Sequence, residues 1–245
     1  MDLGLDGKLV LVTGGSRGIG REIVLGLASS GASVAACFNR ESDDVAKLRS
    51  DLGELGGPSY LERADVSDAA SVQAFVGGAR ERFGRLDCVV NNAGIVSHKL
   101  IDDLDLEEWQ RVIDTNLTSA YLVVKAALPA MGPGGSIVNI TSGVALRGMP
   151  ARAHYISSKA GMIGLTRALC KELGPRGIRV NAIAPGIIET DQTAGLDEAG
   201  RQRYAGLAAL GRLGDPKEIA NPVFFLTSDL SSFVSGQTIN VDGGI

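Results

Sequence analysis

The stretch KLVLVTGGSRGIG, residues 8–20, decides the fold of this chain. Its first half is a short β-branched run typical of a buried strand, and a glycine-rich loop follows at once. Beyond the loop, Ile19, Ile23 and Leu27 recur at the spacing of one helical face. A strand, a tight turn and a helix in this order predict a phosphate site at the helix N-terminus, where free amide groups and the helix dipole favour an anion.

Glycines at 14, 18 and 20 are the key residues of this loop. Together they allow a tight turn, close approach of a pyrophosphate, and close packing of helix on strand. Their spacing is G-x-x-x-G-x-G, which differs from the general G-x-G-x-x-G fingerprint. We expect a dinucleotide to bind here; the alternative is a turn with a purely structural role.

The strand-then-helix pattern repeats almost to the end of the chain. Such alternation is typical of right-handed crossovers and a parallel sheet covered on both faces. We therefore expect an α/β fold: a Rossmann-like, doubly wound, seven-stranded parallel sheet with helices on both faces. The expected strands are 8–14, 33–38, 59–63, 87–94, 135–142, 178–186 and 238–244, and the later helices lie near 41–56, 68–83, 106–130, 152–174 and 215–228.

The least regular segment is 187–212, IIETDQTAGLDEAGRQRYAGLAALGR, which follows the sixth expected strand. Ligands of doubly wound sheets bind beyond the carboxyl ends of the strands. A long polar segment there predicts a substrate lid.

Composition excludes several classes of partner. The chain has 245 residues, a net charge of −4 and a sequence pI of about 5.3, which argues against nucleic acid and anionic membranes. No apolar run approaches the roughly 20 residues that span a bilayer, and the N-terminus does not resemble a signal peptide. Cys37, Cys88 and Cys170 are widely spaced, as expected of free thiols in a reducing cytoplasm. Two histidines without clustered ligands predict no metal site.

The end of the second expected strand, ACFNRES, indicates which dinucleotide binds. NAD-binding proteins usually place an acid there to hold the ribose 2′-hydroxyl. Here Asn39 and Arg40 occupy the position, and Arg17 lies in the glycine loop. Two cations suit a 2′-phosphate and predict NADPH/NADP+. Glu41 is the nearest acid, and both arginines could instead be solvated surface residues.

The segment HYISSKA, residues 154–160, places Tyr155 and Lys159 one helical turn apart. After the glycine loop, the chain also carries NNAG (91–94), Asn116 in TNL and Ser142 in ITS, in that order before the Y-x-x-x-K pair. This order resembles the single-domain branch of the short-chain dehydrogenase/reductase (SDR) family, from about residue 5 to the last. APGIIETD (184–191) and the segment 211–244 narrow the resemblance to the bacterial 3-oxoacyl-(acyl carrier protein) reductases.

The resemblance implies one NAD(P)-binding SDR domain over residues 1–245 and reduction of a ketone. Tyr155 would act as the acid, because an ammonium at Lys159 and an oxidised nicotinamide would lower a phenol pKa that is ordinarily ~10. Lys159 would also bind the nicotinamide ribose. Ser142 would hydrogen-bond the substrate carbonyl. Asn116 would hold a water that links Lys159 to solvent. The alternatives are structural roles: Ser142 as a turn residue and Asn116 as a buried amide that satisfies a backbone group.

The cofactor contacts follow the same resemblance together with the glycine loop. Asp65 and Val66 would meet the adenine, although Asp65 could equally cap the helix that begins near residue 68. Asn91 and Ala93 would lie beneath the adenosine ribose and also stabilise the sheet. The full expected set is Gly14, Ser16, Arg17, Gly18, Ile19, Gly20, Asn39, Arg40, Asp65, Val66, Asn91, Ala93, Gly94, Tyr155, Lys159, Pro185, Gly186, Ile188 and Thr190.

Three aromatic or imidazole side chains near these motifs invite a further role. His154 precedes Tyr155, and neighbouring helical side chains point about 100° apart, so we expect a surface or interface position. His98 lies where the substrate mouth of the family begins. Trp109 fits an apolar helical stripe and is expected to pack.

The substrate is less well defined than the chemistry. Carrier-protein reductases commonly present basic residues before strand five, but LPAMGPGGS (128–136) has none, while Arg176 matches a second basic position. LRGMPARAH (146–154) also departs from the usual pattern at the substrate entrance. Two substrate classes stay open: a 3-oxoacyl thioester, either free or on an acyl carrier protein, and a polyketide or other small ketone.

Two other functions compete with a ketoreductase: an NAD-dependent alcohol or sugar dehydrogenase, and a binding protein that senses the dinucleotide. The resemblance further implies a homotetramer.

Overall fold

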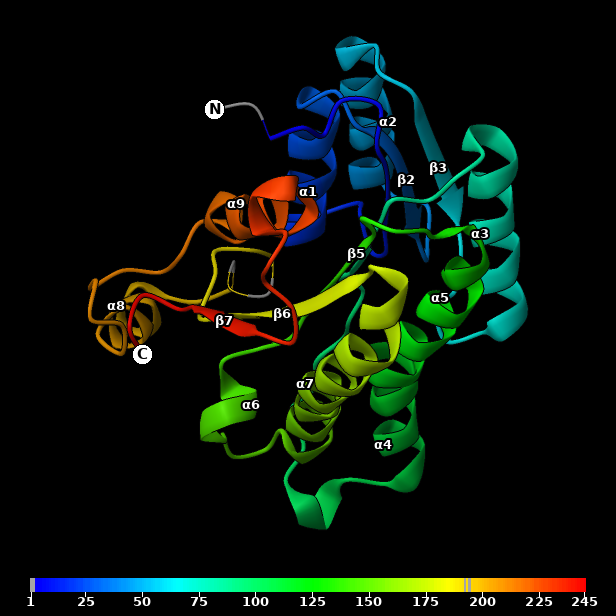
Figure 1. Ribbon diagram of the computed structural model, residues 1–245. Coiled ribbons are helices and arrows are strands. Elements are labelled where there is room, and N and C mark those ends of the chain that lie inside the picture. Colours follow the sequence, from blue (N-terminus) through cyan, green and yellow to red (C-terminus); the bar gives the residue numbers. More distant parts are fainter. Residues whose placement is uncertain (1–2, 192, 194) are drawn as a thin grey trace.

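Seven parallel strands form one sheet in the computed structural model, which describes residues 3–191, 193 and 195–245. The strand order is β3-β2-β1-β4-β5-β6-β7, and helices cover both faces (Figure 1). This arrangement confirms the predicted doubly wound sheet, with the change of winding direction between β1 and β4. The strands are β1 Leu9–Val12, β2 Ser33–Phe38, β3 Ser59–Arg63, β4 Cys88–Asn91, β5 Ser136–Ile140, β6 Arg179–Pro185 and β7 Thr238–Val241, each within its predicted range.

The helices alternate with these strands as the sequence predicted. The α-helices are α1 Gly18–Ser29, α2 Asp43–Leu55, α3 Ala69–Phe83, α4 Leu106–Ile113, α5 Ser119–Ala127, α6 Val144–Arg147, α7 Ala153–Leu173, α8 Glu198–Ala205 and α9 Pro216–Thr227. Short 3₁₀ turns occupy Ile101–Asp103, Leu128–Ala130, Gly174–Arg176 and Asp229–Ser231. The sequence pattern did not predict α6 and α8.

Alternating side chains of the strands form two apolar cores, one on each face of the sheet. Along β1, Val10 and Val12 pack toward α1, α2 and α9, whereas Leu9 and Leu11 pack toward α3 and α5. All four are buried, which explains why the strand is apolar without interruption rather than alternating. Figure 1 shows α1 and α9 side by side, away from α3 and α5.

The glycine loop between β1 and α1 depends on two close backbone approaches. Gly14 has φ +66°, and a Cβ there would lie 2.9 Å from the Ala93 Cα. A Cβ at Gly20 would lie 2.1 Å from the carbonyl oxygen of Gly14. Side chains at these positions would force the loop apart, so the turn needs glycine at both.

The helix predicted over 106–130 is divided. A π-helical turn over Asp114–Thr118 separates α4 from α5 and contains the fully buried Asn116. Such wide turns are frequent at functional sites, because the extra residue redirects one side chain. Trp109, on α4, is half-buried.

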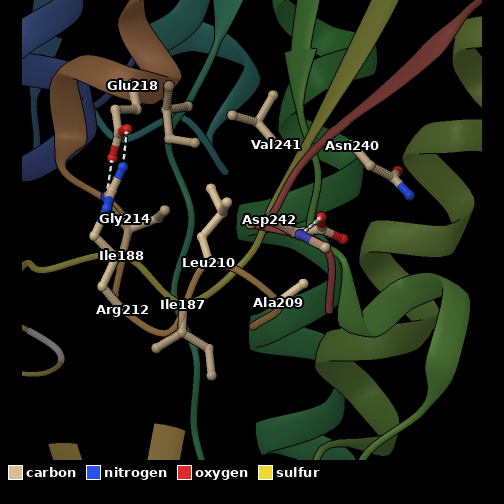
Figure 2. A pocket seen from close by; sticks show the side chains of 13 residues that line it. Ile187, Ile188, Ala209, Leu210, Arg212, Gly214, Glu218, Asn240, Val241 and Asp242 are labelled. Carbon is tan, nitrogen blue, oxygen red and sulfur yellow. Dashed lines mark hydrogen bonds and ion pairs between the residues drawn. The ribbon is translucent and has the colours of Figure 1, made fainter. Parts of the chain in front are cut away.

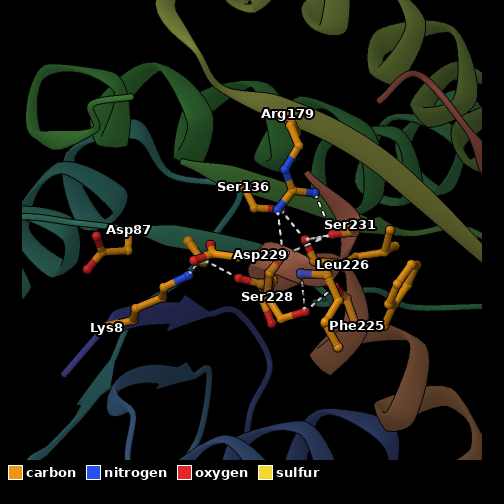
Figure 3. A network of polar contacts seen from close by, with 12 residues as sticks. Lys8, Asp87, Ser136, Arg179, Phe225, Leu226, Ser228, Asp229 and Ser231 are labelled. Carbon is orange, nitrogen blue, oxygen red and sulfur yellow. Dashed lines mark hydrogen bonds and ion pairs between the residues drawn. The ribbon is translucent and has the colours of Figure 1, made fainter. Parts of the chain in front are cut away.

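A polar network at the amino ends of the central strands fastens the turn after α9 to the sheet (Figure 3). Lys8 Nζ donates to Asp229 at 2.7 Å, and Arg179 Nη1 donates to the Ser231 hydroxyl at 2.7 Å. The Ser136 hydroxyl donates to the Leu226 carbonyl at 2.7 Å. These contacts lie at the edge of the sheet opposite to the carboxyl ends of the strands.

The irregular segment predicted over 187–212 begins after β6 and contains α8. A parallel bridge joins Ile188 to Gly214, and Thr190 lies over the glycine loop, 3.3 Å from a Cβ built at Gly18. Residues 192 and 194 of this segment lie outside the described residues. The described part of the segment lines one side of the active-site cavity. We propose that this segment acts as a substrate lid.

Candidate active site

One large cavity, of about 1230 Å³, lies along the carboxyl ends of the strands. It runs from the glycine loop and the end of β2, past the ends of β4, β5 and β6, to α8. All the predicted site residues line it except Asn91 and Asn116. The sequence motifs, which are far apart in the chain, therefore converge on one site.

The three groups expected to act on the substrate meet at the end of β5. Ser142 follows this strand, and its side chain hydrogen-bonds with that of Tyr155 on α7. The Lys159 Nζ lies 6.0 Å from the centre of the Tyr155 ring and donates to the Ile140 carbonyl at 2.8 Å. The regular helix over 153–173 thus delivers the side-by-side placement that the i, i+4 spacing predicted.

Burial shifts the pKa values of both groups of this pair. It raises the pKa of the Tyr155 phenol above its ordinary value, and the hydrogen bond with Ser142 and the charge of Arg152 only oppose this shift. Burial lowers the pKa of the Lys159 ammonium to about 8. In the protein chain without its cofactor, burial therefore outweighs the groups that favour the phenolate. The expected lowering of the Tyr155 pKa by Lys159 together with an oxidised nicotinamide stays a prediction.

Asn116 is held entirely by the chain. Its Oδ1 accepts from the Ile95 amide at 2.8 Å, and its Nδ2 donates to the Ile95 carbonyl and to the Ser158 hydroxyl, both at 3.0 Å. It does not line the cavity, although Gly94 brings the two close: a Cβ there would lie 3.3 Å from Asn116 Oδ1 and 3.2 Å from Lys159 Nζ. The geometry favours a structural amide next to the lysine, and a role in a proton relay stays a proposal.

Asn91 does not line the cavity, which corrects the expected ribose contact, whereas its expected role within the sheet agrees with the structure. It is buried opposite Asn139 in the parallel register of β4 and β5, and its Nδ2 donates to Asn139 Oδ1 at 2.8 Å. Asn139 in turn donates to Thr166 of α7. The next residue faces the loop instead: Asn92 Nδ2 donates to the carbonyls of Thr13 and Gly14.

Thr13 and Asn92 were missed by the sequence reasoning. The Thr13 hydroxyl accepts from the amides of Asn92 and Ala93 at 3.1 and 3.0 Å, so it fixes the NNAG segment against the glycine loop. Both residues lie inside the recognised motifs TGG and NNAG. Short polar side chains beside backbone turns often hydrogen-bond to the backbone, and this could have predicted their role.

The end of the cavity beyond β2 carries Asn39 and Arg40, as predicted. Glu41 does not line it and pairs with Arg49 at 3.4 Å. Asp44, which the sequence reasoning did not consider, does line it. Asp65 also lines the cavity; it accepts from the amide and hydroxyl of Ser67, while Asp68 caps α3, so the capping alternative for Asp65 is wrong.

His154 is fully buried, which corrects the expected surface position. Its Nε2 lies 2.6 Å from the Ser97 hydroxyl, which itself donates to Glu108. Because the serine proton is given to the carboxylate, Nε2–H must donate to Ser97. Arg111 holds Glu108 through two bonds, and these bonds lower the Glu108 pKa to about 2. The cluster ties the loop after β4 to α4 and α7.

A second cavity, of about 450 Å³, lies beyond Ile187 and Ile188 (Figure 2). Leu210 and Val241 contribute apolar walls, and the ion pair between Arg212 and Glu218 lies at one side. Ile187 and Ile188 line both cavities, so they form the partition between them.

Comparison with known proteins decides the family. A family model described as Enoyl-(Acyl carrier protein) reductase matches residues 14–245. The 3-oxoacyl-[acyl-carrier-protein] reductase FabG of Staphylococcus aureus is 40% identical over 240 residues, 97% of this chain and 98% of that protein. The chain belongs to the short-chain dehydrogenase/reductase family.

Other SDR proteins agree in sequence and in shape. The FabG of Chlamydia muridarum is 42% identical over 240 residues, which is 97% of each chain. A short-chain dehydrogenase from Burkholderia cenocepacia, solved in complex with NADP, superposes with a TM-score of 0.92 at 34% identity, covering 98% of both chains. An SDR protein from Serratia marcescens gives a TM-score of 0.93 at 35% identity, again over 98% of both.

The residues of this SDR chain fit a nicotinamide dinucleotide. In the described part of the chain no side chain caps α1, whereas Ser42 caps α2 and Asp68 caps α3, so the first amides of α1 are left for a phosphate. At the other end of the cavity, the buried Lys159 ammonium has no carboxylate partner among the described residues. Across the described residues, no group of His, Cys, Asp and Glu suited to a metal ion occurs, and no helix is long and apolar enough to cross a membrane.

Proposed function

We propose that this chain is an NADPH-dependent ketoreductase that reduces a ketone, a 3-oxoacyl thioester or a related polyketide ketone, to a hydroxyl. The observation that carries the proposal is the convergence of Ser142, Tyr155 and Lys159 at the carboxyl end of β5, in the same cavity as the glycine loop. The names of the curated relatives, which are 3-oxoacyl reductases, support the substrate class.

When bound, the nicotinamide supplies a hydride to the carbonyl carbon of the substrate. Tyr155 donates its phenolic proton to the carbonyl oxygen, and Ser142 hydrogen-bonds that oxygen as its negative charge develops. A raised pKa keeps the phenol protonated at neutral pH, which suits the direction of reduction. Lys159 holds a positive charge beside the phenol and so stabilises the phenolate left after proton transfer.

The cofactor is held along the cavity in the order the motifs suggest. The amides of the glycine loop take the pyrophosphate, and Asp65, Val66 and Ala93 lie toward the adenosine. Arg17 and Arg40 favour the 2′-phosphate of NADPH over the free hydroxyl of NADH. The exposed Arg17 pairs only weakly with Asp191, at 3.5 Å, and Arg40 has no carboxylate partner among the described residues, so both are free to meet a phosphate.

The surface near β5 supports a proposal for substrate delivery. Arg176 is exposed, and its Nη2 donates to the Leu128 carbonyl at 2.8 Å, so one cation does lie beside the segment 128–136, which has none of its own. We propose that an acyl carrier protein docks weakly at this surface. We also propose that the enzyme is a homotetramer and works in the cytoplasm.

The test compares two forms of one substrate. We expect the wild-type chain to oxidise NADPH with a 3-oxobutanoyl thioester on acyl carrier protein and on a pantetheine handle, and to prefer NADPH to NADH. A matched enoyl thioester should not be consumed. Preference for NADH with an alcohol or sugar would support the dehydrogenase alternative.

Tyr155→Phe separates catalysis from binding. We expect turnover to fall at least about 10³-fold, because the proton donor is lost, while the dissociation constant of NADPH, measured by fluorescence, changes little. Turnover that survives this substitution would contradict the proposed role of Tyr155. Tight NADPH binding without reduction of any ketone would favour a sensing protein.

A further inference from the structure

Arg152 lines the active-site cavity one helical turn before Tyr155. It is the N-cap of α7, and residues 152 and 155 share a helical face. Arg152 and Tyr155 therefore face the same cavity from the first turn of α7. The charge of Arg152 lowers the pKa of the Tyr155 phenol, against the larger opposite effect of burial.

The charge of Arg152 is uncompensated, unlike those of two neighbouring cations. Arg111 pairs with Glu108 and Arg147 pairs with Asp242 at 3.2 Å. No carboxylate of the described residues pairs with Arg152; its Nη2 meets the imidazole of His98 at 2.6 Å, and its buried Nε has no hydrogen-bond partner there. Since the guanidinium only donates, His98 Nε2 must accept and the ring must be neutral. Burial and the charge of Arg152 lower the His98 pKa accordingly.

The backbone holds this pair in place. A parallel bridge joins Lys99 to Arg152, and the Lys99 amide donates to the Ala151 carbonyl at 2.9 Å. Ala151 has φ +59°, the one left-handed residue other than glycine in the described chain. Such a conformation is unfavourable for alanine and persists only where the surroundings impose it. The backbone of residues 99 and 151–152 thus holds Arg152 beside His98 at the edge of the cavity.

We propose that Arg152 and His98 bind a carboxylate on the ketone substrate, so that the enzyme prefers oxo acids to neutral ketones. The guanidinium offers N–H groups that match a carboxylate, and an anion in the cavity would balance its uncompensated charge. Arg152 and Tyr155 line one cavity at the start of α7, so the carboxylate and the ketone can belong to one small substrate. The inference rests on the proposed reduction of a ketone, and it selects a ketone that carries a free carboxylate in place of a thioester.

The test uses the full chain, NADPH, and two oxo acids, 3-oxobutanoate and 4-oxopentanoate, each beside its methyl ester. The measured quantity is the ratio of kcat/KM for acid to kcat/KM for ester. This ratio is taken within one preparation, so a partly unfolded variant does not distort it. Arg152→Gln removes the charge, Arg152→Lys keeps the charge without the fork, and Arg167→Gln is the matched control on the exposed face of the same helix.

For the wild type and Arg167→Gln we expect at least one acid to be preferred over its ester by tenfold or more. Arg152→Gln should lower that ratio by about 10- to 100-fold, as expected for a lost charged hydrogen bond, and Arg152→Lys should lie between. A wild-type ratio near one, or a ratio unchanged in Arg152→Gln, overturns the carboxylate site. Reduction of a 3-oxoacyl thioester without reduction of either acid overturns it too and leaves the proposed function intact; failure with every ketone removes both.

Discussion

His154 is a single side chain that links three segments of the molecule. Its ring is wholly buried and donates to Ser97, which connects to Glu108 and Arg111. The sequence could not show this, because Ser97 lies 57 residues earlier and the local argument from neighbouring helical positions says nothing about what packs over a helix start. By contrast, Tyr155 and Lys159 were predictable, since their placement depends only on helical geometry within α7.

We expect His154→Ala to lower the free energy of unfolding by about 3 kcal/mol. The substitution leaves a cavity and removes a donor from the Ser97 hydroxyl. His98→Ala is the matched control, because His98 is exposed and its loss should cost about 1 kcal/mol or less. Urea unfolding followed by circular dichroism measures both. Equal losses for the two histidines would mean that the buried cluster adds no stability.

At the scale of secondary-structure elements, helices α1 and α9 pack against each other at a glycine. A Cβ built at Gly26 would lie 2.2 Å from the Phe224 ring, so a larger residue at this position would have to displace that ring. Glycine here appeared in the sequence only as one of 33, and helical periodicity does not distinguish a glycine that contacts a neighbour from one that faces open space. Strand order and the two-faced apolar cover, however, follow from the pattern of elements and were predicted.

We expect Gly26→Ala to destabilise the protein by about 1–3 kcal/mol, despite the gain in helix propensity. Gly77→Ala is the control on α3, where an added Cβ meets nothing within 4 Å, and it should stabilise by about 0.5–1 kcal/mol. Adding Phe224→Ala should remove most of the penalty of Gly26→Ala. Thermal unfolding of the wild type, Gly26→Ala, Phe224→Ala and the double variant closes this cycle, and strict additivity would exclude a direct clash.

At the scale of the whole molecule, buried thiols and the buried lysine set opposite responses to alkaline pH. Burial raises the pKa of Cys37 and Cys88 from 9.0 to about 12, so between these values the folded chain binds more protons than the unfolded chain and stability falls as pH rises. The Lys159 pKa is lowered from 10.5 to about 8, so its contribution to stability rises with pH across that window. The free thiols were expected from the sequence, but their depth depends on the packing of the sheet.

We expect the stability difference between the wild type and Cys88→Ala to shrink by about 1.4 kcal/mol between pH 8 and pH 10. In the wild type, the Cys88 thiol ionises in the unfolded chain above about pH 9 but stays protonated in the folded chain, which lowers the free energy of unfolding. Cys88→Ala has no such thiol. Lys159 is present in both proteins, so its contribution cancels in the difference. Urea unfolding at several pH values checks this, and Cys37→Ala should behave alike. A difference that stays constant with pH would mean that Cys88 ionises as readily in the folded chain.

The network of Lys8, Asp229, Arg179 and Ser231 lies at the amino ends of the strands, while the reacting groups lie at the carboxyl ends. Substitutions in this network can therefore accumulate with little effect on the reacting groups. The His154 cluster beside Tyr155 has no such freedom, because a change there alters both the stability and the surroundings of the site.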